Sequence, residues 1–258
     1  MTYEKVLQII DLKKTYGKGN AASHALCGVT FDVLRGEFLG IMGASGSGKS
    51  TLLNCIATAT VPTSGKILLC GKDISTLKGK ELAEYRGKRI GYLFQQFELL
   101  DNLTVRENIA LPLCLHGKSA AQACDEIEAF AEEFGISHEL DKFPSELSGG
   151  QKQRAAAVRA LITSPDILLA DEPTGALDSK NSKILLDKLQ FVNREHGVTV
   201  TAVTHDAAAA AYCSRILFIR DGKIFHELRR GEREDRDAFF ARITAVTAQM
   251  GGGSANVL

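Results

Sequence analysis

Short apolar runs and amphipathic segments alternate along the 258 residues of this chain. Residues 6–12 and 29–33 alternate apolar and polar positions, which is typical of half-buried strands. Other short runs are mostly apolar and predict further strands at residues 38–42, 66–72, 89–95, 167–170 and 198–203. Residues 215–220 and 223–226 flank Asp221-Gly222, which predicts a β-hairpin. Between the first two strands, residues 14–20 are expected to form a loop.

Apolar positions at helical spacing predict the helices. One is expected after residue 51, one over 152–162 with Ser148 as its N-cap, and one over 179–195 with Ile184, Leu185, Leu189 and Val192 inward. Two further apolar stripes are Ile127, Phe130, Ala131 and Phe134, and Phe239, Ile243, Val246 and Met250. We expect the last stripe to pack on its own domain, with membrane contact as the alternative. Strands alternating with helices predict an α/β domain with a mainly parallel sheet.

A glycine-rich loop follows the apolar run 38–42 and precedes a predicted helix. It fits the pattern G-x-x-x-x-G-K-[ST] and comprises Gly43, Ala44, Ser45, Gly46, Ser47, Gly48, Lys49 and Ser50, followed by Thr51. Such a loop turns backbone N–H groups toward an anion, and the helix N-terminus adds partial positive charge. Lys49 is expected at the β- and γ-phosphates, and the Ser50 hydroxyl at Mg²⁺. The alternative is a Gly/Ser-rich turn with a chance lysine.

Composition and charge fit a globular domain without a nucleic-acid footprint. The 31 basic and 31 acidic residues balance, so no nucleic-acid or anionic-membrane partner is expected. No apolar run approaches the roughly 18 residues of a membrane span, and residues 1–5 lack the apolar core of a secretion signal. The six cysteines form no C-x-x-C pair, which favours a reducing cytosol with each thiol as a small core residue.

Polar residues follow three of the predicted strands. Asp171-Glu172 ends the run from 167, His205 follows the run from 198, and Gln95 ends the run from 89. Carboxyl ends of parallel strands share one edge of a sheet, which is where ligands bind. Asp171 is expected near Mg²⁺, Glu172 as the general base for water, His205 at the γ-phosphate, and Gln95 at both metal and water. Ordinary structural roles remain the alternative for each residue alone.

A second anion site is predicted where the helix from 152 begins. As in the phosphate loop, small residues here lie at a helix N-terminus, where backbone N–H groups can bind an anion. These residues are Ser148, Gly149, Gly150 and Gln151. One chain thus carries two phosphate-binding surfaces but a single phosphate loop. A head-to-tail two-fold homodimer, with each ATP between one chain's loop and the other's Ser148–Gly150, satisfies both.

Taken together, these motifs resemble ABC-transporter ATPase subunits over residues 3–226. The resemblance places the Walker A loop at 43–50, the Q-loop at Gln95, the signature at 147–151, Walker B at Asp171-Glu172, and the switch histidine at His205. It assigns Gly175-Ala176-Leu177-Asp178 to the D-loop, where serine is commoner than Gly175, and Asp178 to the nucleotide. It also assigns Tyr16 to stacking on adenine.

The resemblance implies a P-loop ATPase core, an N-terminal antiparallel β subdomain and a helical insertion at about residues 96–160. The ATPase domain would span 1–226, and residues 227–258 a charged, solvated stretch and an amphipathic tail helix. ATP and Mg²⁺ would be the cofactors. The partners would be a second copy and a separate integral membrane permease, with a sensor kinase reached through it. The chain would lie on the cytoplasmic face of the inner or plasma membrane, held by the permease.

A finer resemblance concerns the branch. Residues 94–109 and 111–113 resemble the macrolide-export and lipoprotein-release branch, and Leu100-Asp101 with the tail 239–253 resembles its bacitracin-type peptide-resistance members. The alternatives are a motor for lipoprotein release or macrolide export, a soluble ABC ATPase of DNA repair or translation, and a nucleotide-binding regulator without turnover. The single ATPase domain disfavours the soluble class, and intact Glu172 and His205 disfavour the regulator.

Overall fold

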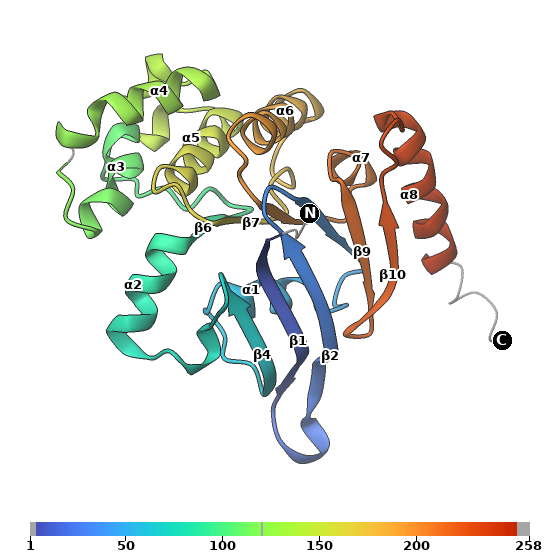
Figure 1. Cartoon of the computed structure of the whole chain (residues 1–258). Coiled ribbons are helices and arrows are strands. Elements are labelled where there is room, and N and C mark those ends of the chain that lie inside the picture. Colours follow the sequence, from blue (N-terminus) through green and yellow to red (C-terminus); the bar gives the residue numbers. More distant parts are fainter. Residues whose placement is uncertain (1–3, 120, 252–258) are drawn as a thin grey trace.

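The computed structural model describes residues 4–119 and 121–251, which form two β-sheets with helices around them (Figure 1). The smaller sheet is antiparallel, as predicted. Its order is β2-β1-β4-β5, with β1 (Lys5–Tyr16), β2 (Ser23–Leu34), β4 (Ser64–Leu69) and β5 (Lys72–Asp73). This sheet is built from residues 5–73, so the N-terminal part of the chain forms a unit that packs beside the phosphate loop.

The larger sheet has six strands in the order β10-β9-β3-β8-β7-β6. All neighbours are parallel except β10 and β9, which are the two arms of the predicted hairpin. Its strands are β3 (Phe38–Met42), β6 (Ile90–Leu93), β7 (Ile167–Asp171), β8 (Val200–Val203), β9 (Arg215–Arg220) and β10 (Lys223–Arg229). Asp221 and Gly222 both have positive φ, 50° and 71°, which is the backbone of a type I′ turn.

Helices cover the larger sheet (Figure 1). Helices α3, α4 and α5 form the helical insertion, and α8 lies beyond the hairpin at the other end of the molecule. The helices are α1 (Lys49–Ile56), α2 (Gly79–Arg89), α3 (Val105–Leu115), α4 (Cys124–Phe134), α5 (Gly149–Leu161), α6 (Ser179–Glu195), α7 (Ala207–Ala210) and α8 (Arg236–Gly251). In the described part of the chain, no helix has the length and apolar content to cross a bilayer.

The central strands are buried on both faces, and alternate residues serve different cores. Leu168 and Ala170 of β7 point into a cluster with the insertion helices, α6 and α8. Ile167 and Leu169 point into a second cluster with α1 and the antiparallel sheet. The six-stranded sheet therefore separates two cores, and only the ends of its strands are free to carry polar chemistry.

Several boundaries differ from the predictions. Strand β1 continues through Tyr16, where a loop was expected, because residues 13–16 pair with β2 as far as Ser23. In α6, Ile184 was expected to be buried but is only half-buried, whereas Leu186 is buried. The boundary predicted at residue 226 falls inside β10, which runs to Arg229.

The cysteines are not all core residues. Cys55 and Cys213 are buried as expected, Cys27, Cys70 and Cys124 are half-buried, and Cys114 on α3 is exposed. The expectation for Cys114 was therefore wrong, because α3 turns that position outward.

The tail helix α8 packs on its own domain. Phe239 and Ile243 are fully buried, and Val246 and Met250 pack against the same core cluster. Together they form the stripe that the sequence predicts, so the apolar face of α8 is covered by the domain itself.

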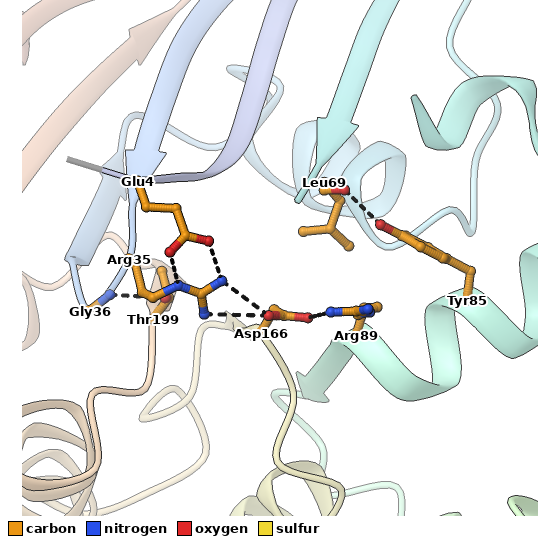
Figure 2. Close-up of polar contacts among 8 residues, drawn as sticks. All are labelled: Glu4, Arg35, Gly36, Leu69, Tyr85, Arg89, Asp166 and Thr199. Atoms are coloured by element: carbon orange, nitrogen blue, oxygen red, sulfur yellow. Dashed lines mark hydrogen bonds and ion pairs between the residues drawn. The ribbon is translucent and has the colours of Figure 1, made fainter. Parts of the chain in front are cut away.

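Asp166, just before β7, joins the antiparallel sheet to the larger one (Figure 2). Its carboxylate accepts a hydrogen bond from Arg89 of α2 at 2.7 Å and weaker ones from Arg35 at 3.4 Å. Arg35 in turn donates to both carboxylate oxygens of Glu4 at 2.7 and 2.8 Å. Burial would raise the pKa of Asp166, but the hydrogen bonds and charges of the arginines outweigh it and lower that pKa.

We predict that Asp166→Asn lowers the free energy of unfolding at pH 7 by about 1–2 kcal/mol, because two guanidinium groups lose a charged acceptor. A carboxyl whose pKa is lowered by folding stabilises the protein above its ordinary value, 3.8 here. This stability is lost as the pH falls through the folded-state pKa. Urea unfolding of both proteins from pH 7 downward measures the difference. If the difference in unfolding free energy between wild type and Asp166→Asn stayed constant to the lowest pH at which the protein folds, the Asp166 charge would not be its cause.

Candidate nucleotide site

Four polar segments meet at one edge of the larger sheet. The register aligns Ile41 of β3 with Val203 of β8, and Val203 with Asp171 of β7. Leu93 of β6 pairs with Ala170. The phosphate loop after β3, His205 after β8, Glu172 after β7 and Gln95 after β6 therefore leave the sheet within a few residues of one row. The parallel strands place these segments together, as the sequence predicts.

The phosphate loop is packed tightly against one strand of each sheet. A Cβ atom at Gly43 would collide with the carbonyl oxygen of Ile219 in β9, and one at Gly48 with that of Ala25 in β2. Gly48 also has φ 104°, a conformation that favours glycine, and it is the N-cap of α1. Both glycines are therefore required by the surroundings of the loop as well as by its own turn.

Lys49 lies almost fully buried at the start of α1. Its Nζ donates to the carbonyl oxygens of Gly43 at 2.8 Å and Ala44 at 2.9 Å. Burial lowers the pKa of Lys49, and the carboxylates of Glu172 and Asp171 partly offset that shift. The lysine charge is thus held over the loop, on the side that faces the two carboxylates.

Glu172 and His205 are in direct contact, which the sequence did not predict. The Oε1 atom of Glu172 lies 2.9 Å from Nδ1 of His205. Glu172 has φ 47°, which is a strained conformation for a residue with a side chain. Its backbone N–H donates to the carbonyl of Val203 in β8 at 2.9 Å, which holds the turn in place. The site therefore contains a carboxylate–imidazole pair in which the carboxylate is largely buried and the imidazole is exposed.

Asp171 is half-buried and lacks one partner. Its Oδ2 lies 3.5 Å from the Tyr92 hydroxyl, whereas its Oδ1 is buried without a hydrogen-bond partner among the described residues. Burial and then the charge of Glu172 raise the pKa of Asp171, and Tyr92, Lys49 and Ser50 pull it back. An orphaned buried carboxylate oxygen beside Ser50 is a group that a cation would satisfy.

A pocket of about 550 Å³ brings most of the predicted residues together. It is lined by the loop residues Gly43–Gly46 and Gly48–Thr51, by Ala25, and by Gln95, Glu172 and His205. Ser47 is buried behind the loop, where its hydroxyl has no partner among the described residues. Gln95 reaches the pocket beside Gly175, since a Cβ atom there would lie 2.7 Å from its Nε2.

The other predicted residues do not line this pocket. Tyr16 is 44% exposed at the end of β1, with Lys14 Nζ 4.9 Å from its ring centre. Exposed Ser148 caps α5 in a reciprocal box with Gln151, whose side chain also donates to Glu139 at 2.8 Å. Asp178 caps α6 by accepting from Asn181.

The family is shown by comparison with known proteins. Residues 26–175 match the family model described as ABC transporter, and they include the phosphate loop, Gln95, Ser148 and Glu172. The chain belongs to the ABC transporter family. It is an ATPase of this family, and it therefore binds ATP.

This ABC ATPase is similar to curated relatives and solved cassettes. The bacitracin export ATP-binding protein BceA of Halalkalibacterium halodurans is 46% identical over 247 residues, covering 96% of this chain and 97% of that protein. The lipoprotein-releasing system ATP-binding protein LolD of Geobacter metallireducens is 41% identical over 219 residues, covering 85% and 97%. The ATP-binding cassette MJ0796, solved as a dimer with ADP and phosphate, is 39% identical with TM-score 0.78, covering 87% and 99%. These findings confirm the predicted family, fold and ATPase activity.

Three residues around the site of this ABC ATPase were not predicted from the sequence. Asn181 of α6 lies against Gly150, where a Cβ atom would collide with its amide. Ala25 of β2 lines the pocket. Gln153 is fully buried on the apolar side of α5, where it shares a face with Ala157 and Ala160. Only Gln153 left a signal, because a polar residue at a buried helical position needs partners.

Proposed function

We propose that this ABC ATPase is the motor subunit of a membrane transporter, that it hydrolyses ATP in a head-to-tail homodimer, and that it serves resistance to peptide antibiotics. The observation that carries the motor mechanism is the pocket in which Lys49, Gln95 and the Glu172–His205 pair surround the phosphate loop.

The residues in the pocket suit a nucleotide triphosphate with Mg²⁺. Loop N–H groups and Lys49 would hold the phosphates. Ser50 and the unpartnered Oδ1 of Asp171 would hold the metal, with the Gln95 side chain beside it. Mg²⁺ takes few carboxylates and keeps water and phosphate ligands, so one carboxylate and one hydroxyl are enough protein ligands. When bound, Mg²⁺ neutralises charge on the phosphates.

Hydrolysis requires a water held in line with the γ-phosphorus, opposite the leaving ADP. Glu172 would accept its proton as general base, because its carboxylate faces the pocket on a fixed turn. His205, held by Glu172 at 2.9 Å, would orient that carboxylate and donate to the γ-phosphate. Gln95 would position the same water from the β6 side. Tyr16 would stack on the base from the exposed end of β1.

The signature residues support a site shared between two chains. Ser148–Gln151 caps α5 but lines no part of the chain's own phosphate-loop pocket. Ser148 is exposed, so a second copy's nucleotide can reach it and the following N–H groups. Asp178, which caps α6 near Gly150 through Asn181, would lie at the same junction. The dimeric form of the MJ0796 cassette is consistent with this arrangement.

A groove beside Gln95 suits a permease segment. It has a volume of about 540 Å³ and lies between α2, β6, α3 and α5. Phe94 and Leu115 are 41% and 78% exposed on its walls, together with Leu111 and Pro112. Exposed apolar side chains at a groove favour insertion of a partner's helix. The chain would thereby be held at the cytoplasmic face of the membrane.

The cargo assignment rests on how much of this chain each relative matches. The bacitracin export protein BceA matches 96% of this chain, whereas LolD matches 85% although 97% of its own length is covered. Proteins of the bacitracin type therefore account for a longer part of this sequence. We accordingly favour antimicrobial-peptide resistance, with a sensor kinase reached through the permease, over lipoprotein release or macrolide export.

We predict that Glu172→Gln retains ATP binding and lowers kcat by about 10²–10⁴-fold, because the general base is lost while the phosphate contacts remain. Trapped ATP should hold two chains together. Steady-state ATPase assays and gel filtration with ATP measure both effects. Wild-type turnover in this variant would show that Glu172 is not the base.

The shared site predicts complementation between two inactive chains. Lys49→Ala removes the positive charge that holds the phosphates. Ser148→Arg places a large side chain where the signature would contact the other chain's ATP. A mixed dimer contains one composite site with both intact Lys49 and intact Ser148. Activity should therefore return on mixing the two purified variants, and each variant alone at the same total concentration is the control. No recovery at concentrations where the mixed dimer forms would contradict the head-to-tail arrangement.

The biological role predicts a conditional phenotype. A chromosomal Glu172→Gln strain should grow normally in plain medium and become sensitive to bacitracin-like or lantibiotic peptides. Minimum inhibitory concentrations for the variant and parent strains measure this. Growth arrest with lipoproteins retained at the inner membrane, and unchanged peptide sensitivity, would instead identify a lipoprotein-release motor.

A further inference from the structure

The segment after Gln95 turns through two consecutive left-handed residues. Phe97 and Glu98 have φ values of 47° and 50°. This conformation costs roughly 1–2 kcal/mol for each residue that carries a side chain, so neighbouring groups must hold it. The turn places the Phe97 ring beside the signature, 3.7 Å from where a Cβ atom on Gly149 would lie.

Arg159 of α5 supplies side-chain contacts that hold this turn, in addition to the hydrogen bond from the Glu98 N–H to the Gln96 carbonyl. Its guanidinium donates to the carbonyl oxygen of Phe97 at 2.9 Å and to that of Glu98. Burial lowers the pKa of Arg159, and the charge of Glu98 partly offsets that shift. Arg159 is half-buried, and its planar fork fits two adjacent carbonyls better than a lysine amine does.

The same helix holds the other side of Gln95. Gln153 Nε2 donates to the carbonyl of Phe94 at 2.9 Å and to that of Pro173, which follows Glu172, at 2.8 Å. In addition, Gly91 of β6 lies so close to the Ala160 carbonyl that a Cβ atom would collide with it. Helix α5 is therefore fixed to β6 and to both ends of the segment that carries Gln95.

We propose that Arg159 is a positioning residue: by holding the Phe97–Glu98 turn it sets Gln95 at the edge of the phosphate-loop pocket and ties it to the helix whose N-terminus carries Ser148. Arg159 touches neither the phosphate loop nor the pocket lining. Its effect therefore falls on turnover rather than on nucleotide binding. This inference rests on the proposed ATPase mechanism.

The test uses the full chain with Arg159→Gln and Arg159→Lys, each also combined with Glu98→Gly or Glu98→Ala. Both Glu98 substitutions remove the same carboxylate, but only glycine adopts the left-handed backbone without strain. Arg194→Gln on the exposed end of α6 is the matched arginine control. Steady-state ATPase kinetics give kcat and KM, a fluorescent ATP analogue gives nucleotide affinity, and circular dichroism follows unfolding.

We expect Arg159→Gln to lower kcat about tenfold, with nucleotide affinity within about twofold of wild type. The kcat of Arg159→Lys should lie between those of wild type and Arg159→Gln. Glu98→Gly should restore at least a third of the lost activity, and Glu98→Ala should not. Rescue by glycine alone distinguishes positioning from a general loss of packing. If Arg159→Gln does not fold, the same comparison is made in Arg159→Lys.

The inference is overturned if Arg159→Gln turns over within twofold of wild type, or if Glu98→Gly and Glu98→Ala act alike. It is also overturned if affinity and kcat fall together. If the wild type itself hydrolysed no ATP, the proposed function would fall and this inference with it. An active wild type and Arg194→Gln, with an equally active Arg159→Gln, would remove only the inference.

Discussion

The position of the phosphate loop is set by contacts that leave no space for side chains. The carbonyls of Ile219 and Ala25 approach Gly43 and Gly48 from two different strands. The hairpin turn adds to this, since Gly222 N–H donates to Ser47 at 3.1 Å and its carbonyl accepts from Cys27 at 2.8 Å. Segments from both sheets are thus joined at the loop. The smaller sheet and the C-terminal hairpin consequently fix where the phosphates can bind.

Helix α5 gives the second constraint, because it begins at the signature and contacts both ends of the segment that carries Gln95. Its N-terminus presents the Ser148 cap, its middle holds Phe94 and Pro173 through Gln153, and Arg159 holds the turn after Gln95. All of these contacts are made by residues of this one helix. A displacement of α5 by a partner in the neighbouring groove would therefore reach the Gln95 segment directly.

Much of this architecture is predictable from sequence because buried parallel strands and a phosphate loop have strong local patterns. The edge that gathers Lys49, Glu172 and His205 follows from the strands being parallel, because their carboxyl ends then share one edge. What escaped prediction depends on long-range contacts. Strand β1 reaches Tyr16 only because β2 pairs with it, and the left-handed turn at Glu172 is held by β8. The Arg159 contacts join residues about 60 positions apart, and no local propensity encodes them.

The uneven burial of the cysteines makes their thiols react at different rates. Burial raises the pKa of the Cys55 thiol to about 11 and that of Cys213 further. Both thiols are also inaccessible, whereas Cys114 is exposed on α3, one residue before the groove residue Leu115. Because maleimides react with accessible thiolate, a fluorophore would attach first to Cys114, ahead of the half-buried Cys27, Cys70 and Cys124. Its emission would then sense the environment of the groove without any engineered cysteine.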